Sequence, residues 1–405
     1  MAEVEILIVG GGIAGASTAY HLALLGRRVT LLERGEIACE ASGVNAGGLG
    51  GTGWGNNPGL HSYLTMGSLE LFKTIQVDLG YPIEFRQSGA LQAIQTDEQY
   101  EFVRDKVLCL RSQGYAVELL TPREALAVEP EANPALLGFM YSPGRGQADP
   151  VKATRALASL AQRSGARILT SHDVTSFQSL TDGSWQVMAS GREFCAGVLV
   201  LAAGAWCGPI GAMLGLHIPI VSVRGQMWAT QSLPPRLFHV ISSAESELHW
   251  RRDPGNDART SSELTHREET RLTRHLYGRQ TKSGEVIFGG DRQVDGYGRV
   301  VDAAGIEVNR GQAGEVIPML RKLSIEQTWA GVMPFALDGK PLIGKIPQLE
   351  NLYIVGGMAS SGFGRGPMAG KLLADYIHTG HRPHVLTEAD PARCVTLVER
   401  RNHPK

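Results

Sequence analysis

The sequence lacks the residue patterns that mark several large classes of protein. Only five cysteines occur in 405 residues, and no two of them form a CxxC pair. They are scattered along the chain as Cys39, Cys109, Cys195, Cys207 and Cys394. This spacing argues against a thiolate metal site and against a disulfide framework, and it fits a reducing compartment. HExxH sequences, paired carboxylates and a Ser/His/Asp set are also missing, so we expect no metal and no hydrolytic machinery.

The sequence also lacks an excess of positive or negative charge, and it lacks long apolar runs. The formal net charge is −1, which gives no reason to expect a nucleic-acid partner or an anionic membrane surface. No apolar run reaches the roughly 18 residues of a membrane-spanning helix. Glu3 and Glu5 precede the first apolar run, where a secretory signal would carry basic residues. We therefore expect a cytoplasmic protein without a transmembrane segment.

Glycine, by contrast, is abundant, with 50 residues that cluster at a few sites. The first cluster follows a short apolar strand over residues 5–9 and contains Gly10, Gly12 and Gly15 in a GxGxxG pattern. Glycines at these three positions permit a tight turn, the close approach of a pyrophosphate and close helix–strand packing. The helical spacing over residues 16–25 then places a helix N-terminus, with its free N–H groups, beside the phosphates.

A second strand, over residues 28–32, ends at Glu33. A carboxylate at this point can accept hydrogen bonds from ribose hydroxyls and disfavours the extra phosphate of NADP. Strand, glycine turn, helix, strand and acid together predict a dinucleotide-binding unit. Its predicted contacts are Gly10, Gly12, Ile13, Ala14, Gly15, Glu33 and Arg34.

Three further segments favour FAD over NAD. Residues 40–53 are too rich in glycine for a helix and offer hydroxyl, amide and N–H groups to a pyrophosphate and a flavin ring. Residues 198–208 read as a buried strand whose end abuts the cofactor. Near the C-terminus, a strand over 351–356, a glycine-rich loop over 357–371 and a helix over 369–377 aim a helix N-terminus at a bound group. Such an end stabilises the negative charge of a reduced flavin.

These motifs together resemble the D-amino-acid oxidase superfamily, and most of all glycine oxidase, sarcosine oxidase and D-amino-acid dehydrogenase. The resemblance rests on the sequences GGGIAG, ASGVNAGG, VLAAGAW, DGKPLIG and SGFGRGPMAGKLLADYI, which spread over nearly the whole chain. It implies an α/β FAD-binding domain of the glutathione-reductase type, interleaved with an α+β substrate domain on a mixed, largely antiparallel sheet. We expect the FAD-binding domain in residues 1–85, 146–215 and 326–390, the substrate domain in 86–145 and 216–325, and a tail in 391–405.

The resemblance also implies a reaction and a set of contacts. An amino acid or secondary amine would transfer a hydride to flavin N5 and leave as an imine, with O₂ or a quinone or carrier reoxidising the flavin. The cofactor residues implied by position, beyond the N-terminal unit, are Ser42, Asn45, Ala46, Gly47, Gly48, Val174, Ala203, Gly204, Trp206, Gly331, Gly357, Ser361, Gly362, Phe363 and Gly364.

The sequence departs from this family where a substrate carboxylate would bind. Glycine oxidases and D-amino-acid dehydrogenases carry an arginine before the DGxPxIG motif, and Met333 holds that place here. Methionine cannot supply a bidentate contact to a carboxylate, although it packs well. Arg279, on the strand where Tyr277 is expected to meet the carboxylate, is the first candidate to replace it, with a surface ion pair as the alternative. No cysteine lies between Gly331 and Asp338, so we expect noncovalent FAD.

Other functions stay open at this stage. The chain could be the flavoprotein subunit of a larger opine- or sarcosine-type dehydrogenase, with the polar stretch over residues 251–274 as a docking surface or simply a solvated loop. It could be a noncatalytic FAD-binding module. Oxidation of hydroxy acids or glycerol phosphate uses the same fold and is a minor alternative.

Overall fold

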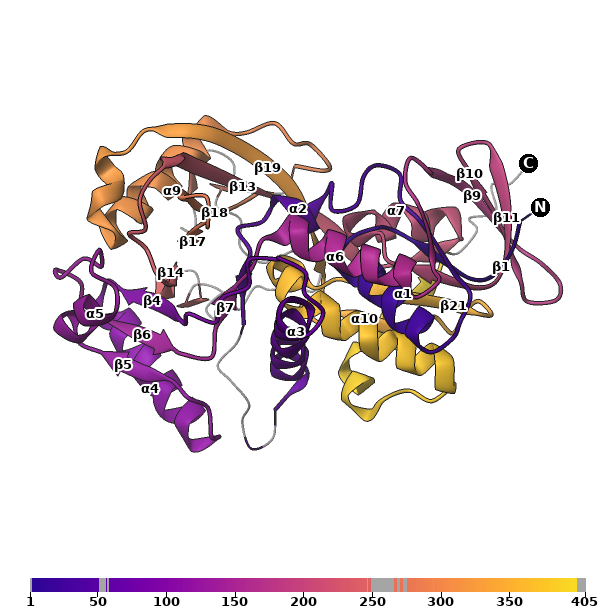
Figure 1. Ribbon diagram of the computed structural model, residues 1–405, viewed down its shortest axis with the longest axis horizontal. Coiled ribbons are helices and arrows are strands. Elements are labelled where there is room, and N and C mark those ends of the chain that lie inside the picture. The colour runs from indigo at the N-terminus through magenta and orange to yellow at the C-terminus, as the bar shows by residue number, and fades with distance from the viewer. Residues whose placement is uncertain are drawn as a thin grey trace.

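Two large β-sheets lie side by side along the long axis of the molecule (Figure 1). The computed structural model describes residues 2–50, 56, 58–245, 247–248, 266–267, 270–271, 275–293 and 295–398. The polar stretch 251–274 therefore lies almost entirely outside the described residues. Over the described part of the chain, no helix has both the length and the apolar character needed to cross a membrane.

The first sheet carries the N-terminal motif. Its main strands, in spatial order, are β20 (Leu342–Lys345), β21 (Leu352–Gly356), β11 (Arg192–Leu201), β1 (Ala2–Val9), β2 (Val29–Leu32) and β8 (Arg167–Leu169). From β21 to β8 the neighbours are parallel, and the antiparallel strands β9 (Val174–Ser179) and β10 (Trp185–Ala189) extend from β11. This is the parallel, crossover-connected arrangement that the strand–turn–helix–strand pattern predicts.

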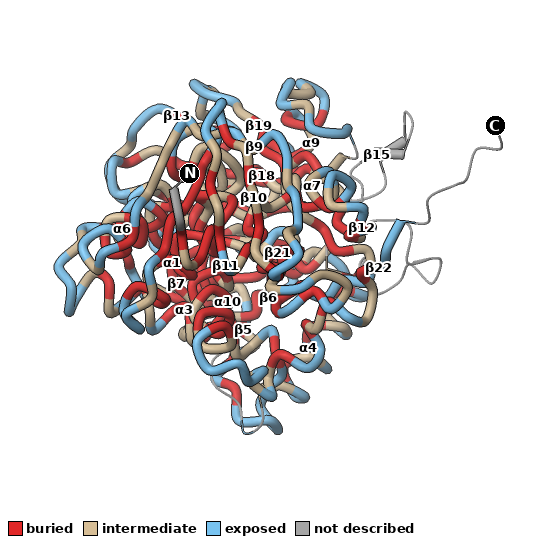
Figure 2. The backbone as a smooth tube through the Cα atoms, turned by 90° about the vertical axis from the view of Figure 1, so that its right-hand side faces the viewer, coloured by how far each residue is buried: buried red, intermediate tan, exposed pale blue. Residues whose placement is uncertain are grey.

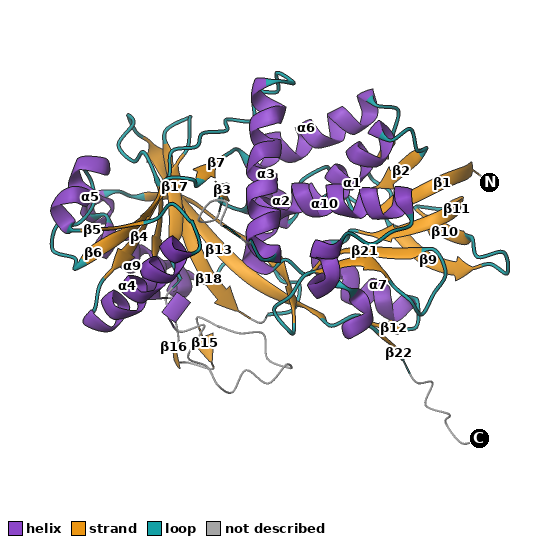
Figure 3. Cartoon of the chain, turned by 90° about the horizontal axis from the view of Figure 1, so that it is seen from below, coloured by secondary structure: helices purple, strands orange, loops and turns teal. Residues whose placement is uncertain are grey.

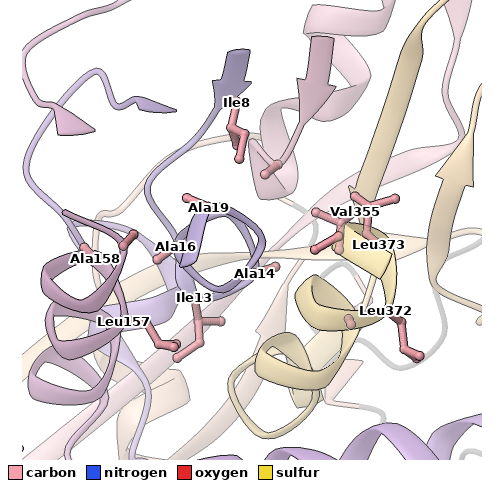
Figure 4. Close-up of a cluster of buried hydrophobic side chains, with 14 of the residues drawn as sticks. Ile8, Ile13, Ala14, Ala16, Ala19, Leu157, Ala158, Val355, Leu372 and Leu373 are labelled. Carbon is pink, nitrogen blue, oxygen red and sulfur yellow. The ribbon is translucent and has the colours of Figure 1, made fainter. Parts of the chain in front are cut away.

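Successive side chains of β1 point to opposite faces of the first sheet, so they contribute to two separate hydrophobic clusters. Ile6 and Ile8 face a cluster formed with α1 (Ile13–Leu24), α6 (Pro150–Arg163), α3 (Leu60–Val77) and α10 (Gly362–Thr379), and Figure 4 shows part of this cluster. Leu7 and Val9 face the opposite cluster, which includes Trp185 and Cys207 of α7 (Cys207–Met213). Figure 3 shows α1, α6 and α10 on one side of the sheet and α7 on the other. Strands buried on both faces explain the continuous apolar runs in the sequence, and Figure 2 shows the buried residues running through β11, α1 and α10.

The second sheet is largely antiparallel, as expected. Its strands, in order, are β19 (Ile325–Ala336), β13 (Ile220–Ser232), β18 (Glu285–Gln293), β17 (Tyr277–Gln280), β14 (Val240–Ser243), β4 (Ala90–Ile94), β6 (Gly138–Ser142) and β5 (Glu118–Leu120). The helices that accompany it are α4 (Asp97–Ser112), α5 (Pro122–Val128) and α9 (Ala303–Val316). Residues 326–336, placed by sequence in the FAD-binding domain, belong to β19 and pair with β13 in this second sheet. The long β13–β19 pair ends beside the first sheet, because Pro219 accepts a hydrogen bond from Leu337 just before the chain enters β20.

Shorter elements complete the fold. β3 (Gly48–Leu49) pairs with β7 (Gly146–Gln147), β12 (Leu216–His217) with β22 (Thr396–Leu397), and β15 (His266–Arg267) with β16 (Thr270–Arg271). The remaining turns are α2 (Ala41–Val44), η1 (Gly204–Trp206), η2 (Pro318–Lys322), η3 (Ala359–Ser361), η4 (His384–Ala389) and η5 (Pro391–Arg393).

Helices α1 and α10 cross at very short distance because glycines of α10 meet the backbone of α1. A Cβ at Gly370 would lie 2.7 Å from the carbonyl oxygen of Ala14, and a Cβ at Gly366 would lie 2.6 Å from the side chain of Ile13. The hydroxyl of Ser17 also donates to the carbonyl of Pro367 at 2.6 Å. These contacts therefore fix the position of α10 relative to the first turns of α1.

We expect Gly370→Ala to destabilise the protein by about 1–3 kcal/mol, because the new methyl group has no space in the crossing. The matched control is Gly311→Ala in α9, where no atom lies within 4 Å of an added Cβ. That change should stabilise by about 0.5–1 kcal/mol through helix propensity alone. Urea unfolding of both variants measures the difference, and equal effects at the two sites would contradict the close-packing argument.

Candidate cofactor and substrate site

The glycine turn after β1 has the shape needed to receive a diphosphate. Gly10 has φ +116°, and an added Cβ would overlap the backbone of Ala202. At Gly15 it would overlap the carbonyl of Gly10, whereas at Gly12 it would meet only the hydroxyl of Ser42, at 3.0 Å. The open side of Gly12 is therefore the side that lines a cavity. Helix α1 begins there with Gly12 as an N-cap residue that has no side chain and with no acidic residue in its first turn, so its N-terminus keeps a positive dipole end.

Glu33 holds the end of β2 against this turn. Its side chain is buried, and its two carboxylate oxygens accept hydrogen bonds from the backbone N–H groups of Gly11, at 2.7 Å, and Gly35, at 2.8 Å. A carboxylate has about four lone-pair directions, so acceptors remain for ribose hydroxyls on the cavity side. Ribose binding by Glu33 stays a prediction, with which these free acceptor directions are compatible. The neighbouring Arg34 lies over the ring of Trp206, at 3.8 Å from its centroid, and pairs with Glu40.

The segment after Glu33 corrects one expectation from the sequence. Residues 41–44, judged too rich in glycine for a helix, form the single turn α2. Gly43 makes this turn feasible, because a Cβ there would overlap the carbonyl of Ala38. Asn45 closes it by donating from its side-chain amide to the carbonyl of Ala41 at 2.9 Å, and Ser42 accepts from the backbone N–H of Ile13 at 2.9 Å. The turn thereby places Ser42 and Asn45 beside the N-terminus of α1.

The C-terminal segment corrects a second expectation. The glycine-rich loop predicted over residues 357–371 is shorter, since α10 begins at Gly362 and contains Pro367 within the helix. Gly357 has φ +69° and allows the turn between β21 and η3. Gly362 and Phe363, in the first turn of α10, line the same cavity as the first turn of α1. Two helix N-termini thus point into one cleft.

The cleft contains about 1450 Å³ of empty space, including the part that opens to solvent. The predicted cofactor residues that line it are Gly10, Gly12, Ile13, Ala14, Glu33, Arg34, Ser42, Asn45, Val174, Ala203, Gly204, Trp206, Gly362 and Phe363. The other predicted cofactor residues are not among those that line it, and they are Gly15, Ala46, Gly47, Gly48, Gly331, Gly357, Ser361 and Gly364. The cleft connects the dinucleotide turn to the second sheet, where Tyr277 and Met333 also line it.

Sequence reasoning missed several residues of this cleft. They include His172 and Asp173 near Val174, Pro209, Ile210 and Met213 of α7, Val332 and Pro334 beside Met333, and Met358, Ala359 and Ser360 after β21. Some neighbour a predicted residue and could have been found from it. The α7 residues carry no sequence motif, and only the tertiary fold brings them to the cleft.

The second sheet makes very short contacts with α2, which lies in the segment over residues 40–53 that is predicted to bind the flavin, called the flavin-binding segment below. A Cβ at Gly331 would overlap the side chain of Val44, so β19 can reach α2 only with glycine at that position. The indole N–H of Trp329 donates to the carbonyl of Val44 at 2.7 Å. The backbone N–H of Ala46 donates to the Tyr277 hydroxyl at 3.5 Å. Burial raises the pKa of Tyr277, so the phenol is neutral at physiological pH.

Arg279 does not occupy the position expected of a carboxylate clamp. Its guanidinium is almost fully buried and donates to the carbonyls of Ala46 and Ala148 and to the side chain of Gln147. Burial lowers its pKa to about 10, so it remains charged. Arg279 is not among the residues that line the cleft. Strand β17 runs past the cleft at this point, so Arg279 stabilises the backbone behind the flavin-binding segment.

The fold and the cleft are those of a dinucleotide-binding protein, with a cleft that runs from a glycine turn to a second, largely antiparallel sheet. A family model described as "FAD dependent oxidoreductase", of the DAO group, matches residues 5–376. The chain therefore belongs to this family of FAD-dependent oxidoreductases, and the resemblance to the D-amino-acid oxidase superfamily is confirmed. FAD is the cofactor of the family, and the glycine turn, Glu33 and the two helix N-termini fit it.

Individual relatives have low sequence identity to this chain, but each match extends over most of it. Dimethylglycine dehydrogenase of Rattus norvegicus is 28% identical over 403 residues, a match that covers 96% of this chain and 44% of that protein. Glycine oxidase of Geobacillus kaustophilus is 27% identical, with 92% of each chain covered. The crystal structure of L-proline dehydrogenase from P. horikoshii superposes with a TM-score of 0.81 at 26% identity, covering 97% of this chain and 98% of that one. The chain thus spans less than half of the mammalian relative and nearly all of the bacterial and archaeal ones.

Within the described residues, no cluster of three or more His, Cys, Asp or Glu side chains could hold a metal ion. The cleft is lined instead by backbone, apolar side chains and a few polar groups. Such a lining suits a reaction in which the cofactor carries the electron transfer, while the protein binds and orients.

We expect Glu33→Gln to weaken FAD binding by about 10- to 100-fold, because hydrogen bonds to a charged acceptor contribute about 1.5–3 kcal/mol. Flavin fluorescence during titration of the apoprotein with FAD gives the dissociation constant. The control is Glu36→Gln, which changes an exposed carboxylate three residues further on. Equal affinity in the two variants would remove Glu33 from the ribose-binding role.

Proposed function

We propose that the chain oxidises an amino acid or a secondary amine at its C–N bond and releases an imine. The observation that carries this proposal is the position of the cleft, which ends against the second sheet, where Tyr277 and Met333 line it from the same face of the sheet. FAD, when bound, would accept the hydride equivalent from the substrate. The relatives support the class of substrate, because those reported above are named for dimethylglycine, glycine and L-proline.

The side chains at this end of the cleft would bind and orient the substrate without acting as bases. Tyr277 offers a neutral hydroxyl, and Val332, Met333 and Pro334 offer an apolar wall that excludes water. An amine that enters in its neutral form carries the lone pair needed to stabilise the forming imine, so the protein need not remove a proton from carbon. The absence of a carboxylate or histidine among the described residues of this wall agrees with such a mechanism.

We also propose that FAD is held noncovalently. None of the described residues that line the cleft is a cysteine, and no cysteine lies between Gly331 and Asp338. The thiol of Cys207 is fully buried below the first sheet, and burial raises its pKa to about 12, which makes it a poor nucleophile. Acid precipitation should therefore release the whole of the flavin into solution.

The proposal predicts that an amine or amino acid reduces the bound FAD under anaerobic conditions. The purified holoprotein would be titrated with D- and L-amino acids, N-methyl amino acids, proline analogues and opines while its visible flavin absorbance is recorded. We expect one class to bleach the flavin, and admission of air then separates an oxidase from a dehydrogenase. Lactate and glycerol 3-phosphate serve as matched compounds without nitrogen.

Other outcomes would contradict the proposal in different ways. Bleaching by a compound without nitrogen alone would assign the enzyme to alcohol oxidation. Reduction by dithionite but by no member of the panel would favour a noncatalytic flavin. Activity that returns only after addition of a second polypeptide would support the alternative of a subunit in a larger dehydrogenase.

A further inference from the structure

A loop of the second sheet extends to the part of the cleft that contains the glycine turn. Residues 295–301 of this loop lie between β18 and α9, and the second sheet holds both of their ends. Arg224 of β13 pairs with Asp295 at the start of the loop. At its end, Asp302 caps the first turn of α9 and accepts a hydrogen bond from the side chain of Gln293 at 2.7 Å. The loop therefore leaves the second sheet from two fixed points.

The middle of this loop contacts residues that follow two strands of the first sheet. The hydroxyl of Tyr297 donates to the carbonyl of Ala205 at 3.2 Å, and the ring centroids of Tyr297 and Trp206 lie 5.2 Å apart. Arg299 pairs with Glu40. Trp206 and Glu40 both line the cleft, whereas Tyr297 and Arg299 are not among the residues that line it. The loop therefore holds two residues of the cleft wall without lining the cleft itself.

The two contact points lie on opposite sides of the glycine turn. In the first sheet, β1 lies between β11 and β2, and the three strands are parallel, so their carboxyl ends lie at one edge. Trp206 follows β11, the glycine turn follows β1 and Glu40 follows β2. Arg34 joins the two sides, because its guanidinium lies 3.8 Å from the ring centroid of Trp206 and 2.5 Å from Glu40. These contacts and the loop thus form a closed ring that spans the turn predicted to receive the diphosphate.

We propose that residues 295–301 are a clasp that closes over bound FAD and sets the rate at which the cofactor enters and leaves the cleft. Tyr297 and Arg299 are then positioning residues, which act on the cofactor through Trp206 and Glu40. The proposal concerns the cofactor of the family and not the substrate. A failure of the proposed amine oxidation would therefore leave it intact.

The contacts of the clasp predict a distinctive kinetic effect, because each of them joins protein to protein. Opening the clasp costs the same free energy with and without FAD, so a weaker clasp should accelerate entry and release by the same factor. The dissociation constant, which is the ratio of the two rates, should stay nearly unchanged. Loss of a side chain that touches FAD directly would instead raise the dissociation constant, because it weakens the complex alone.

The test compares Tyr297→Ala, Tyr297→Phe and Arg299→Gln with the wild type. Val300→Ala is the matched control, because Val300 lies in the same loop and is 77% exposed. Exchange of bound FAD for radiolabelled FAD in the holoprotein gives the release rate, and mixing of the apoprotein with FAD gives the entry rate and the dissociation constant. We expect Tyr297→Ala to accelerate both rates about 10- to 30-fold, since an aromatic pair and a hydrogen bond are lost. Tyr297→Phe keeps the ring and Arg299→Gln removes a half-exposed ion pair, so each should accelerate them about 3-fold.

A double-mutant cycle tests whether Arg299 acts through Glu40. In a Glu40→Gln background, Arg299→Gln should change neither rate further, because the ion pair is already lost. Additive effects of the two changes would remove Arg299 from the clasp.

Two outcomes for Tyr297 would overturn the proposal. One is an equal release rate in Tyr297→Ala and Val300→Ala. The other is a dissociation constant that rises in proportion to the release rate at an unchanged entry rate, since this is the behaviour of a direct contact. Urea unfolding shows whether each variant is folded, and if Tyr297→Ala is not, Tyr297→Phe and Arg299→Gln decide by the same two criteria.

Discussion

The close approach of α1 to two other backbones is the constraint on which the rest of the site depends. Gly15 allows α1 to touch the turn at Gly10, and Gly370 allows α10 to touch α1. Side chains at either point would push the helices apart by about the thickness of a methyl group. Because both contacts are backbone contacts, they fix the directions of the two helices more rigidly than packed side chains would. The N-termini of α1 and α10 therefore open into one cleft, and the N-terminus of α10 is delivered by a segment more than three hundred residues away.

A second set of glycines joins this cleft to the other sheet. Gly331 brings β19 against α2, and Gly225 leaves space beneath the side chain of Met333. The hydrogen bond from Trp329 to Val44 holds the junction, and Arg279 holds the following backbone from behind. The second sheet is thus attached to the backbone around α2 both by its edge strand β19, through Trp329, and by the interior strand β17, through Arg279. Burying Arg279 is tolerated because its donors meet carbonyl and amide acceptors.

Sequence alone predicted the parts of the site in which residue type determines local geometry. The turn at Gly10–Gly15, the acid Glu33 and the strand after Asn351 each combine a special backbone with a distinctive residue, so their roles can be read locally. Whether Arg279 could bind a substrate carboxylate could not be predicted from the local sequence in this way. Arg279 is two residues from Tyr277 and shares its face, yet β17 has already passed the cleft at that point. Gly290, with φ +127°, is an extra residue in β18 that shifts the pairing with β13 and so decides that Arg292 projects from the face of Gly225. Without that bulge Arg292 would project from the opposite face.

The charges around the cleft are separated along its length. Glu33 and Glu40 line the cleft beside the glycine turn, the first turns of α1 and α10 line it as well, and Tyr277 lines it from the second sheet. Tyr277 adds no negative charge there, because burial keeps its phenol protonated. A chain whose net charge is close to zero thus directs two helix N-termini into the cleft, where a bound diphosphate and a reduced flavin would place negative charge. The same helix N-termini would oppose the approach of a cationic amine, in agreement with the proposal that the nitrogen of the substrate is neutral when it reacts.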